Sequence, residues 1–356
     1  MTARTPHVPA DRLVAGLVPP PRFADVSFGS YVPDPSQPSQ AAAVRALDAF
    51  AASLGPGRRG SGADRGDREG RAGRRARWWP ARSRPAPPGE ARGVYLDGGF
   101  GVGKTHLLAS LWHAAPAEPA RKAFCTFVEL THLAGALGFQ EAVRALSGHR
   151  LLCVDEFELD DPGDTVLVST LLGRLADAGV ALAATSNTLP GRLGEDRFAA
   201  ADFLREIQGL AARFRTLRVD GEDYRHRGLP EAPPPLSPDA VVRAAHRLPG
   251  ACLDGFPALL GHLAALHPSR YGALCDGVRA VCLTGVAPVP DQAAALRLVV
   301  LADRLYDREV PVLASGTPLD RLFSPEMLRG GYRKKYHRAV SRLTALARDG
   351  ARLAQA

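Results

Sequence analysis

The sequence predicts an α/β fold in which a parallel sheet is covered by helices on both faces. Three observations support this prediction. Between residues 93 and 219, short apolar runs rich in β-forming residues alternate with helical patterns, as they do in chains of βα units. A glycine-rich loop follows the first run and precedes the first helical pattern. A later run ends in two adjacent carboxylates, Asp155 and Glu156.

The alternating region contains enough elements for a five-stranded sheet. We expect strands at residues 93–97, 123–128, 150–155, 180–186 and 214–219. We expect helices near residues 104–114, 131–146, 162–178 and 199–213. Strands joined by helical crossovers run in the same direction, so the sheet should be parallel.

The rest of the chain is long enough for a second domain, since it has 356 residues in all. In the N-terminal part, Ser39 is expected to cap a helix from Gln40 to Leu54. Towards the C-terminus, two apolar runs, Val278–Val286 and Val310–Ala314, indicate a mixed subdomain of unspecified arrangement. The expected units are an N-terminal extension, a disordered Arg/Gly/Pro-rich insertion, the sheet-containing core, a proline-rich linker and the C-terminal subdomain, at residues 1–54, 55–92, 93–227, 228–239 and 240–356.

The net charge of +8 is concentrated in two short segments. Residues 55–92 carry 11 arginines and four acidic residues, and residues 329–348 carry seven Lys or Arg and no acidic residue. Because each segment contributes +7, the remaining residues together are acidic. The charge is therefore weak evidence for a nucleic-acid-binding body.

Cysteine usage and hydropathy indicate a reducing, aqueous compartment. The five cysteines are odd in number and form no C-x-x-C pair, so free thiols are expected rather than disulfides or a metal site. No apolar run approaches the roughly 18 residues that a membrane-spanning helix requires. We therefore expect a cytoplasmic protein.

Residues 98–105 read Gly-Gly-Phe-Gly-Val-Gly-Lys-Thr, the pattern of a phosphate-binding loop. In such a loop backbone N–H groups face the β-phosphate, Lys104 reaches the β- and γ-phosphates, and the Thr105 hydroxyl binds Mg²⁺. ATP and Mg²⁺ are therefore the expected ligands. The alternative is a glycine-rich turn that only opens a helix. The expected nucleotide-binding residues are Gly98, Gly99, Phe100, Gly101, Val102, Gly103, Lys104, Thr105 and His106.

The carboxylates after Leu151–Val154 match the Walker B pattern of nucleotide hydrolases. Asp155 is expected to hold Mg²⁺ through water, and Glu156 to act as the general base or to position the attacking water. A capped strand end without catalytic function is the alternative.

The run Ala181–Ser186 ends at Asn187, which predicts the additional-strand (AAA-like) class of P-loop ATPases. In that class a strand lies between the P-loop strand and the Walker B strand. Its terminal Asn, sensor 1, helps to orient the attacking water, and Asn187 fits this role in type and order. A turn-forming Asn is the alternative.

Taken together, these motifs resemble the ZapE-type family of AAA-like cell-division ATPases, which has mitochondrial relatives. The resemblance spans about residues 23–346. It implies ATP hydrolysis linked to the division ring and its tubulin-like polymer FtsZ, and a possible homo-oligomer. The segments that carry it are Tyr95–Gly99, Lys104–Thr105, Asp155–Phe157, Ala184–Asn187, Asp223–Arg225, Arg304–Asp307 and Ser341–Leu343.

The family places an arginine in the sequence R-x-x-F-L-P after sensor 1, and this chain has Ala200 there and Arg205 at the proline position. The candidates for an arginine finger from a neighbouring subunit are Arg205 and, next, Arg197. Arg297, expected to open a helix Arg297–Tyr306, could instead act within the same chain as sensor 2.

The basic segment 329–348 allows a rival function, a nucleic-acid-associated ATPase of the replication-loader type. Tyr332 and Tyr336 lie among its cations and could stack on bases. The alternatives are a packed helix with a solvated basic face, since Tyr336, Val340, Leu343 and Ala347 recur at helical spacing, and a docking surface for an acidic protein. Nucleic-acid binding is the less favoured function. A small-molecule kinase is disfavoured because Asp155-Glu156 supplies a water-activating base.

Overall fold

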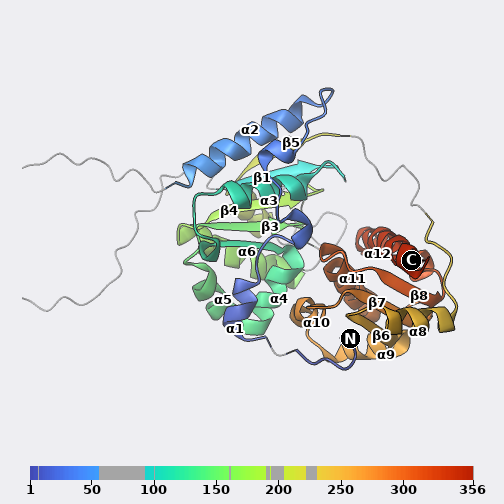
Figure 1. Cartoon of the computed structure of the whole chain (residues 1–356). Helices are drawn as coiled ribbons and strands as arrows, with labels where there is room; N and C mark the ends of the chain where they lie inside the picture. The colour runs from blue at the N-terminus through green and yellow to red at the C-terminus, as the bar shows by residue number, and fades with distance from the viewer. Residues whose placement is uncertain are drawn as a thin grey trace, which may run out of the picture.

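The computed structural model describes residues 1–6, 8–55, 93–99, 101–159, 162–189, 193, 204–221 and 231–355 (Figure 1). Of the expected insertion 55–92, only Gly55 lies within these ranges. Phe100, Arg197 and the Asp223–Arg225 motif also lie outside the described residues. The described chain forms two sheets, each with helices packed on it, and we call the two halves the N-terminal lobe (residues 8–221) and the C-terminal lobe (residues 231–355).

The N-terminal lobe contains a five-stranded parallel sheet, as predicted. Its strands are β1 (Gly93–Gly98), β2 (Lys122–Thr126), β3 (Leu151–Asp155), β4 (Ala181–Ser186) and β5 (Phe214–Val219). Their order across the sheet is β2-β3-β4-β1-β5. Because β4 pairs with both β1 and β3, the additional strand lies where the sequence predicted it.

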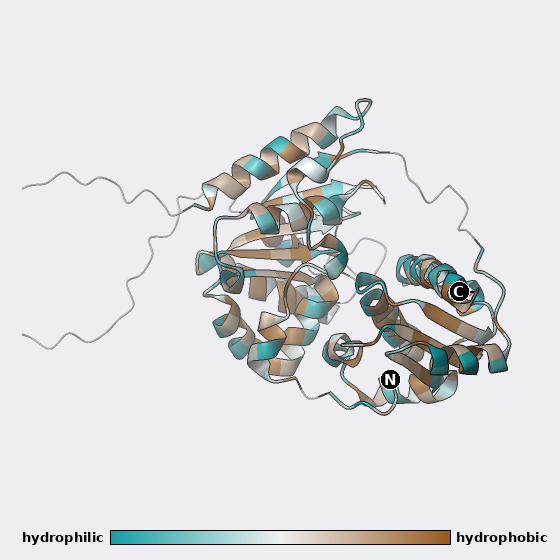
Figure 2. Cartoon of the chain, in the orientation of Figure 1, coloured by the Kyte–Doolittle hydropathy of each residue, from teal (hydrophilic) through white to brown (hydrophobic). Residues whose placement is uncertain are grey.

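Alternation of side chains along each strand gives the sheet two apolar faces. In β1, Val94 and Leu96 pack against one set of helices, and Tyr95 packs against the other. The first set consists of α2 (Pro38–Ser53) and α3 (Lys104–Ala114). The second set consists of α1 (Ala10–Ala15), α4 (Phe127–Leu137), α5 (Phe139–Leu146), α6 (Pro162–Asp177) and α7 (Leu204–Ala211). Figure 2 shows the hydrophobic strands enclosed between these layers.

Three sequence expectations in this lobe were wrong in detail. The helix expected at 131–146 is two helices, α4 and α5, because Gly138 between them has φ of 81°, which an L side chain rarely adopts. The second strand ends at Thr126 rather than 128, since Thr126 caps α4. Ser39 is not the cap of α2, which begins at Pro38; its hydroxyl accepts the N–H of Asp220 instead.

The C-terminal lobe has a three-stranded parallel sheet of order β6-β7-β8. Its strands are β6 (Ala251–Gly255), β7 (Ala280–Val286) and β8 (Val312–Gly316), so β7 lies within the first predicted apolar run and β8 begins within the second. One face is covered by α8 (Pro238–Arg247). The other face is covered by α9 (Phe256–Ala265), α10 (Tyr271–Leu274), α11 (Gln292–Asp307) and α12 (Arg333–Gln355).

Short 3₁₀ turns occur in both lobes, at Pro21–Phe23, Phe28–Ser30, Pro119–Arg121, Pro268–Arg270 and Leu319–Arg321.

The basic segment 329–348 lies largely in helix α12, which packs on the C-terminal lobe as the packed-helix alternative predicted. Its basic face is not wholly solvated, because Arg338 and Arg342 are only about one fifth exposed. Tyr336, Val340, Leu343 and Ala347 are all buried in the core of the C-terminal lobe. The Tyr336 ring stacks at 4.8 Å on Phe323, so it is not available to stack on a base. No helix in the described part of the chain is long and apolar enough to cross a membrane.

Candidate functional site

The glycine-rich loop joins β1 to α3 at the carboxyl edge of the first sheet. Gly101 and Gly103 have φ of 79° and 83°, the left-handed region that favours glycine. A Cβ atom on Gly103 would lie 2.7 Å from the ring of Tyr31, whose hydroxyl donates to the Val102 carbonyl at 2.8 Å. The N-terminal segment therefore packs directly on the loop. His106, in the first turn of α3, contacts the same segment through Ser30 Oγ at 2.9 Å.

Lys104 begins α3, and its ammonium group points back into the loop. The residue is only 9% exposed, and burial lowers the pKa of the amine to about 8. Its Nζ donates to the carbonyls of Gly98 at 2.9 Å and Gly99 at 2.5 Å. It also donates to Asn187 Oδ1 at 2.8 Å. The end of β4 therefore contacts the loop through two predicted site residues. Lys104 is the residue predicted to bind phosphate, and Asn187 is the residue predicted to orient the attacking water.

Asp155 ends β3 and is 5% exposed. Its carboxylate accepts a hydrogen bond from Thr105 Oγ1 at 2.9 Å and another from Thr185 Oγ1 of β4. Burial, with Glu156 as a second cause, raises the pKa of Asp155. The predicted pair of metal-binding side chains is therefore in direct contact.

This pair suits Mg²⁺, which takes oxygen ligands and is commonly bound through one or two protein side chains, waters and substrate phosphates. The described residues contain no group of three or more His, Cys, Asp or Glu that could form a complete protein cage for a metal. A Mg²⁺ ion here would therefore rely on Thr105, Asp155 and the phosphates of a nucleotide.

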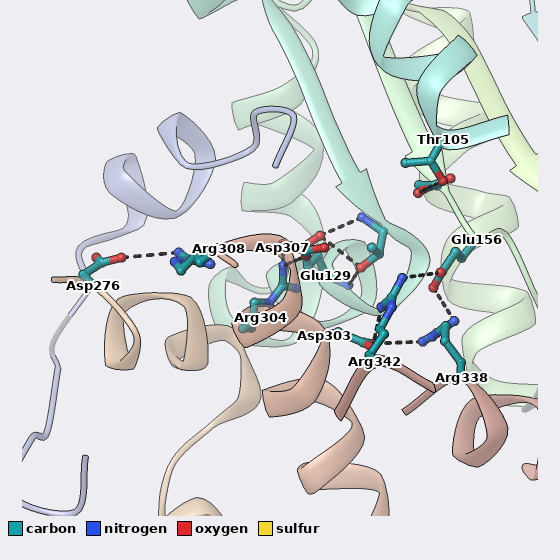
Figure 3. Close-up of polar contacts among 12 residues, drawn as sticks. Thr105, Glu129, Glu156, Asp276, Asp303, Arg304, Asp307, Arg308, Arg338 and Arg342 are labelled. Atoms are coloured by element: carbon teal, nitrogen blue, oxygen red, sulfur yellow. Dashed lines mark hydrogen bonds and ion pairs between the residues drawn. The ribbon is translucent and has the colours of Figure 1, made fainter. Parts of the chain in front are cut away.

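Glu156 follows in a left-handed backbone conformation, with φ of 53°, and its N–H donates to Thr185 Oγ1 at 3.0 Å. This conformation is uncommon for a residue with a side chain and indicates a position held by its surroundings. The Glu156 carboxylate forms ion pairs with Arg338 and, at 3.2 Å, with Arg342 (Figure 3). Both arginines lie on α12 of the C-terminal lobe.

The sequence analysis assigned these two arginines no place in the candidate site, although Arg342 lies within the Ser341–Leu343 segment that carries the family resemblance. The helical spacing of apolar residues in 329–348 predicted the buried face of α12. By the same spacing, Arg338 and Arg342 are four residues apart and lie together on another face of the helix. Nothing in the sequence indicates which acidic residues they meet, because Glu156 lies 186 positions before Arg342.

The arginine candidates from the sequence have different surroundings. Arg205 is exposed on α7. Arg297 does not open its helix, since α11 begins at Gln292. The Arg297 guanidinium donates to the carbonyls of Leu263 and Leu266, both at 3.0 Å. These bonds tie Arg297 to the end of α9 rather than to the phosphate-binding loop, so the structure does not support a sensor 2 role for it.

A cavity of about 1060 Å³ lies between the lobes and is bounded by residues of both. Thr105, Asp155 and Glu156 line it from the N-terminal lobe, and Arg338 and Arg342 line it from α12. Farther along the same interface, Arg304 of α11 pairs with Glu129 at 2.7 Å and lies 3.9 Å from Asp307. Charged side chains of the two lobes therefore meet at this interface (Figure 3).

Comparison with known proteins identifies relatives over most of the chain. The AFG1-like ATPase family model matches residues 7–249 and 239–352. The cell division protein ZapE of Escherichia coli K12 is 29% identical over 292 residues, which cover 71% of this chain and 77% of that protein. An uncharacterised protein of Schizosaccharomyces pombe is 29% identical over 153 residues, covering 39% of this chain and 34% of that one.

Among solved structures, DnaI matches 59% of this chain and 98% of its own, with a TM-score of 0.41 and 16% identity. The DnaC helicase loader matches 56% of this chain and 99% of its own, with a TM-score of 0.35 and 16% identity.

Proposed function

Since the chain belongs to the AFG1-like ATPase family, we propose that it hydrolyses Mg²⁺-bound ATP to ADP and phosphate at the edge of the first sheet. One observation carries the proposal. Lys104 contacts Asn187, Thr105 contacts Asp155, and Glu156 adjoins Asp155, although these residues come from three separate segments of the chain. A purely structural loop would not require all of these groups to meet.

Each group has a role that its geometry suits. The loop from Gly98 to Thr105 would cradle the phosphates, with Lys104 exchanging its carbonyl partners for the β- and γ-phosphates. Thr105 and Asp155 would hold Mg²⁺, which would neutralise charge developing on the phosphates. Burial in a site of low dielectric strengthens these interactions.

Hydrolysis would proceed by attack of a water oxygen on the γ-phosphorus, with cleavage of the bond to the bridging oxygen of ADP. Glu156 would accept the proton of this water, and Asn187 would orient it. An arginine of a neighbouring subunit, either Arg205 or Arg197, is the proposed donor to the transition state if the protein assembles. The assembly itself is part of the proposal.

The proposed partner is a protein of the cell-division ring, FtsZ or another component, in the cytoplasm. The support is the likeness to the cell division protein ZapE over 71% of the chain. A nucleic-acid-associated ATPase of the replication-loader type is the alternative.

The test is the ATP hydrolysis rate of the full chain alone, with polymerised FtsZ, and with single-stranded DNA. Stimulation by FtsZ and not by DNA supports the division-ring function. Stimulation by DNA alone supports the alternative. Absence of hydrolysis under all three conditions, with Mg²⁺ present, contradicts the ATPase proposal itself.

A further inference from the structure

The first residues of the chain are bound to the C-terminal lobe, although the residues that follow them pack on the N-terminal lobe (Figure 1). The Met1 side chain is buried in the core of the C-terminal lobe. Asp254 of β6, itself 5% exposed, accepts hydrogen bonds from the Thr2 N–H at 2.9 Å, from Thr2 Oγ1 at 2.5 Å and from the amino group of Met1 at 2.6 Å. Arg4 Nη1 donates to two backbone carbonyls at and just after the end of α10, at 3.2 and 2.7 Å. We call these contacts the anchor.

From the anchor the chain crosses to the N-terminal lobe and follows it as far as the phosphate-binding loop. We call the described residues 1–6 and 8–31 the strap. The Leu17 carbonyl accepts the N–H of Phe124 at 2.8 Å, so the strap pairs with the outer edge of β2, which is an edge strand of the sheet. Farther on, the Tyr31 hydroxyl donates to a carbonyl of the loop, and the Tyr31 ring packs on the loop. The strap therefore joins the C-terminal lobe to the loop that would hold the phosphates.

The strap also forms a wall of the cavity between the lobes. Residues of the strap between Val8 and Ala24 line the same cavity as the predicted metal-binding side chains. In this stretch Arg22 reaches across to the C-terminal lobe, where its guanidinium lies 4.7 Å from the ring centre of Tyr306. The C-terminal lobe thus holds the strap at two places, the anchor and Arg22. These contacts have to break before the C-terminal lobe can move away from the strap.

We propose that the strap ties the two lobes together around the nucleotide cavity, and that breaking its anchor is the step that lets a nucleotide in or out. The inference rests on the proposed ATPase function. A nucleotide bound at Thr105 and Asp155 would lie in a cavity that the strap closes on one side. The anchor consists of a few hydrogen bonds, most of them at least partly exposed, and such contacts open locally far more often than the whole fold unfolds.

A gate of this kind changes rates and leaves affinity unchanged. The closed form holds the nucleotide, and it remains the main form when the anchor is only weakened, so the contacts with the nucleotide and the Kd stay the same. Entry and release both occur from the open form, so both rate constants rise in proportion to the population of that form. A substitution that damaged the binding site would instead weaken binding.

The experiment uses stopped-flow fluorescence to measure association and dissociation of N-methylanthraniloyl-ADP, with Mg²⁺ present, on the full chain. In the variant Asp254→Ala/Arg4→Ala both rate constants should rise about 5- to 50-fold, the factor expected when two or three partly exposed hydrogen bonds are lost. The Kd should stay within about threefold of the wild-type value. Thr5→Ala/Arg321→Ala is the matched control and should change neither rate constant, because these exposed side chains form no hydrogen bond with a described residue.

A second variant changes the anchor from the side of the strap and leaves the C-terminal lobe as it is. Thr2→Ala/Arg4→Ala removes the Thr2 hydroxyl and the Arg4 guanidinium, and it keeps the buried Asp254. Both rate constants should rise in this variant also, by a smaller factor, because the backbone N–H of Thr2 and the amino group of Met1 still bind Asp254. This variant tests the proposal even if Asp254→Ala does not fold.

Two outcomes overturn the strap as a gate. One is that both variants exchange the nucleotide at wild-type rates. The other is that dissociation alone becomes faster and the Kd rises in step with it, since the strap would then contribute binding energy without controlling access. A wild-type chain that does not bind the nucleotide at all contradicts the proposed function instead, so the two failures are distinguishable.

Discussion

Lys104 is the residue on which nucleotide binding should depend most. Its amine is buried and held by Gly98, Gly99 and Asn187, so no other lysine can take its place in the loop. Lys104→Ala should reduce ATP affinity or turnover by more than about tenfold, because a point charge on the phosphates is lost. Calorimetry and a steady-state hydrolysis assay measure the effect. Lys334→Ala, at the start of α12, is the control, and near-normal ATP binding and hydrolysis by Lys104→Ala would contradict the P-loop assignment.

Glu156 should affect the chemical step rather than nucleotide binding. Glu156→Gln keeps the Thr105–Asp155 contact and removes the base, so we expect ATP to bind and single-turnover hydrolysis to slow by about 10²- to 10⁴-fold. Loss of ATP binding in this variant would instead indicate a structural role. The uncommon backbone conformation of Glu156 makes the distinction worth measuring, since φ of 53° leaves its placement dependent on Thr185 and α12.

The sequence identified most of the candidate site because its motifs are local. The loop, Asp155-Glu156 and Asn187 each lie at the carboxyl end of a strand, and parallel strands bring such ends to one edge. Arg338, Arg342 and Asp303 could not be predicted, because their contacts with Glu156 and with one another depend on how α11 and α12 pack. Periodicity specifies a buried face, but it does not specify the partners of the charged face.

At the scale of elements, the errors of the sequence prediction lay at the end of a strand, at the start of a helix and at a break between two helices. All five strands were predicted, and so was the position of β4 between β1 and β3. The single helix predicted at 131–146 was wrong, because Gly138 was not recognised as a break. The sequence also contained a signal for the start of α4 that the prediction did not use. Thr126 and Glu129 form a capping box, in which Thr126 Oγ1 accepts the Glu129 N–H at 3.2 Å and Glu129 accepts the Thr126 N–H at 2.7 Å. This box ends β2 and starts α4.

The capping box leads to a stability prediction. Thr126→Ala should lower the free energy of unfolding by about 1 kcal/mol, because an N–H at the start of α4 loses its acceptor. Denaturant unfolding measures the change. Thr131→Ala on the same helix is the control, since its hydroxyl only bonds back to the Val128 carbonyl, and it should change stability by less than about 0.5 kcal/mol. Equal effects of the two substitutions would show that the cap is not stabilising.

At the scale of the whole molecule, the two lobes meet through charges placed around a cavity. Glu129 and Glu156 from the first lobe face Arg304, Arg338 and Arg342 from the second. Such pairs are sensitive to any added charge, because partial burial weakens screening by solvent. The arrangement suits an interface that rearranges when a polyphosphate enters, and an apolar interface of the same extent would not respond in this way.

Asp307 should make the stability of this interface depend on pH. Its side chain, on α11, is 13% exposed, and burial raises the pKa of its carboxyl from 3.8 to about 7. The positive charges of Arg342 and Arg304 oppose this rise in pKa, and the negative charges of Asp303 and Glu129 add to it. Between about pH 4 and 7 the folded state therefore holds a proton that the unfolded state has released. The stability contributed by Asp307 is accordingly highest at low pH and is lost as the pH rises through 7.

Asp307→Asn removes this titration, so the variant should gain stability relative to the wild type by more than about 1 kcal/mol between pH 5 and pH 8. Denaturant unfolding at several pH values measures the difference. Asp276→Asn, whose carboxylate is exposed beside Arg308, should show a constant offset from the wild type across the same range. A constant offset for Asp307→Asn as well would mean that Asp307 is already ionised at pH 5 and that Arg304 and Arg342 outweigh its burial.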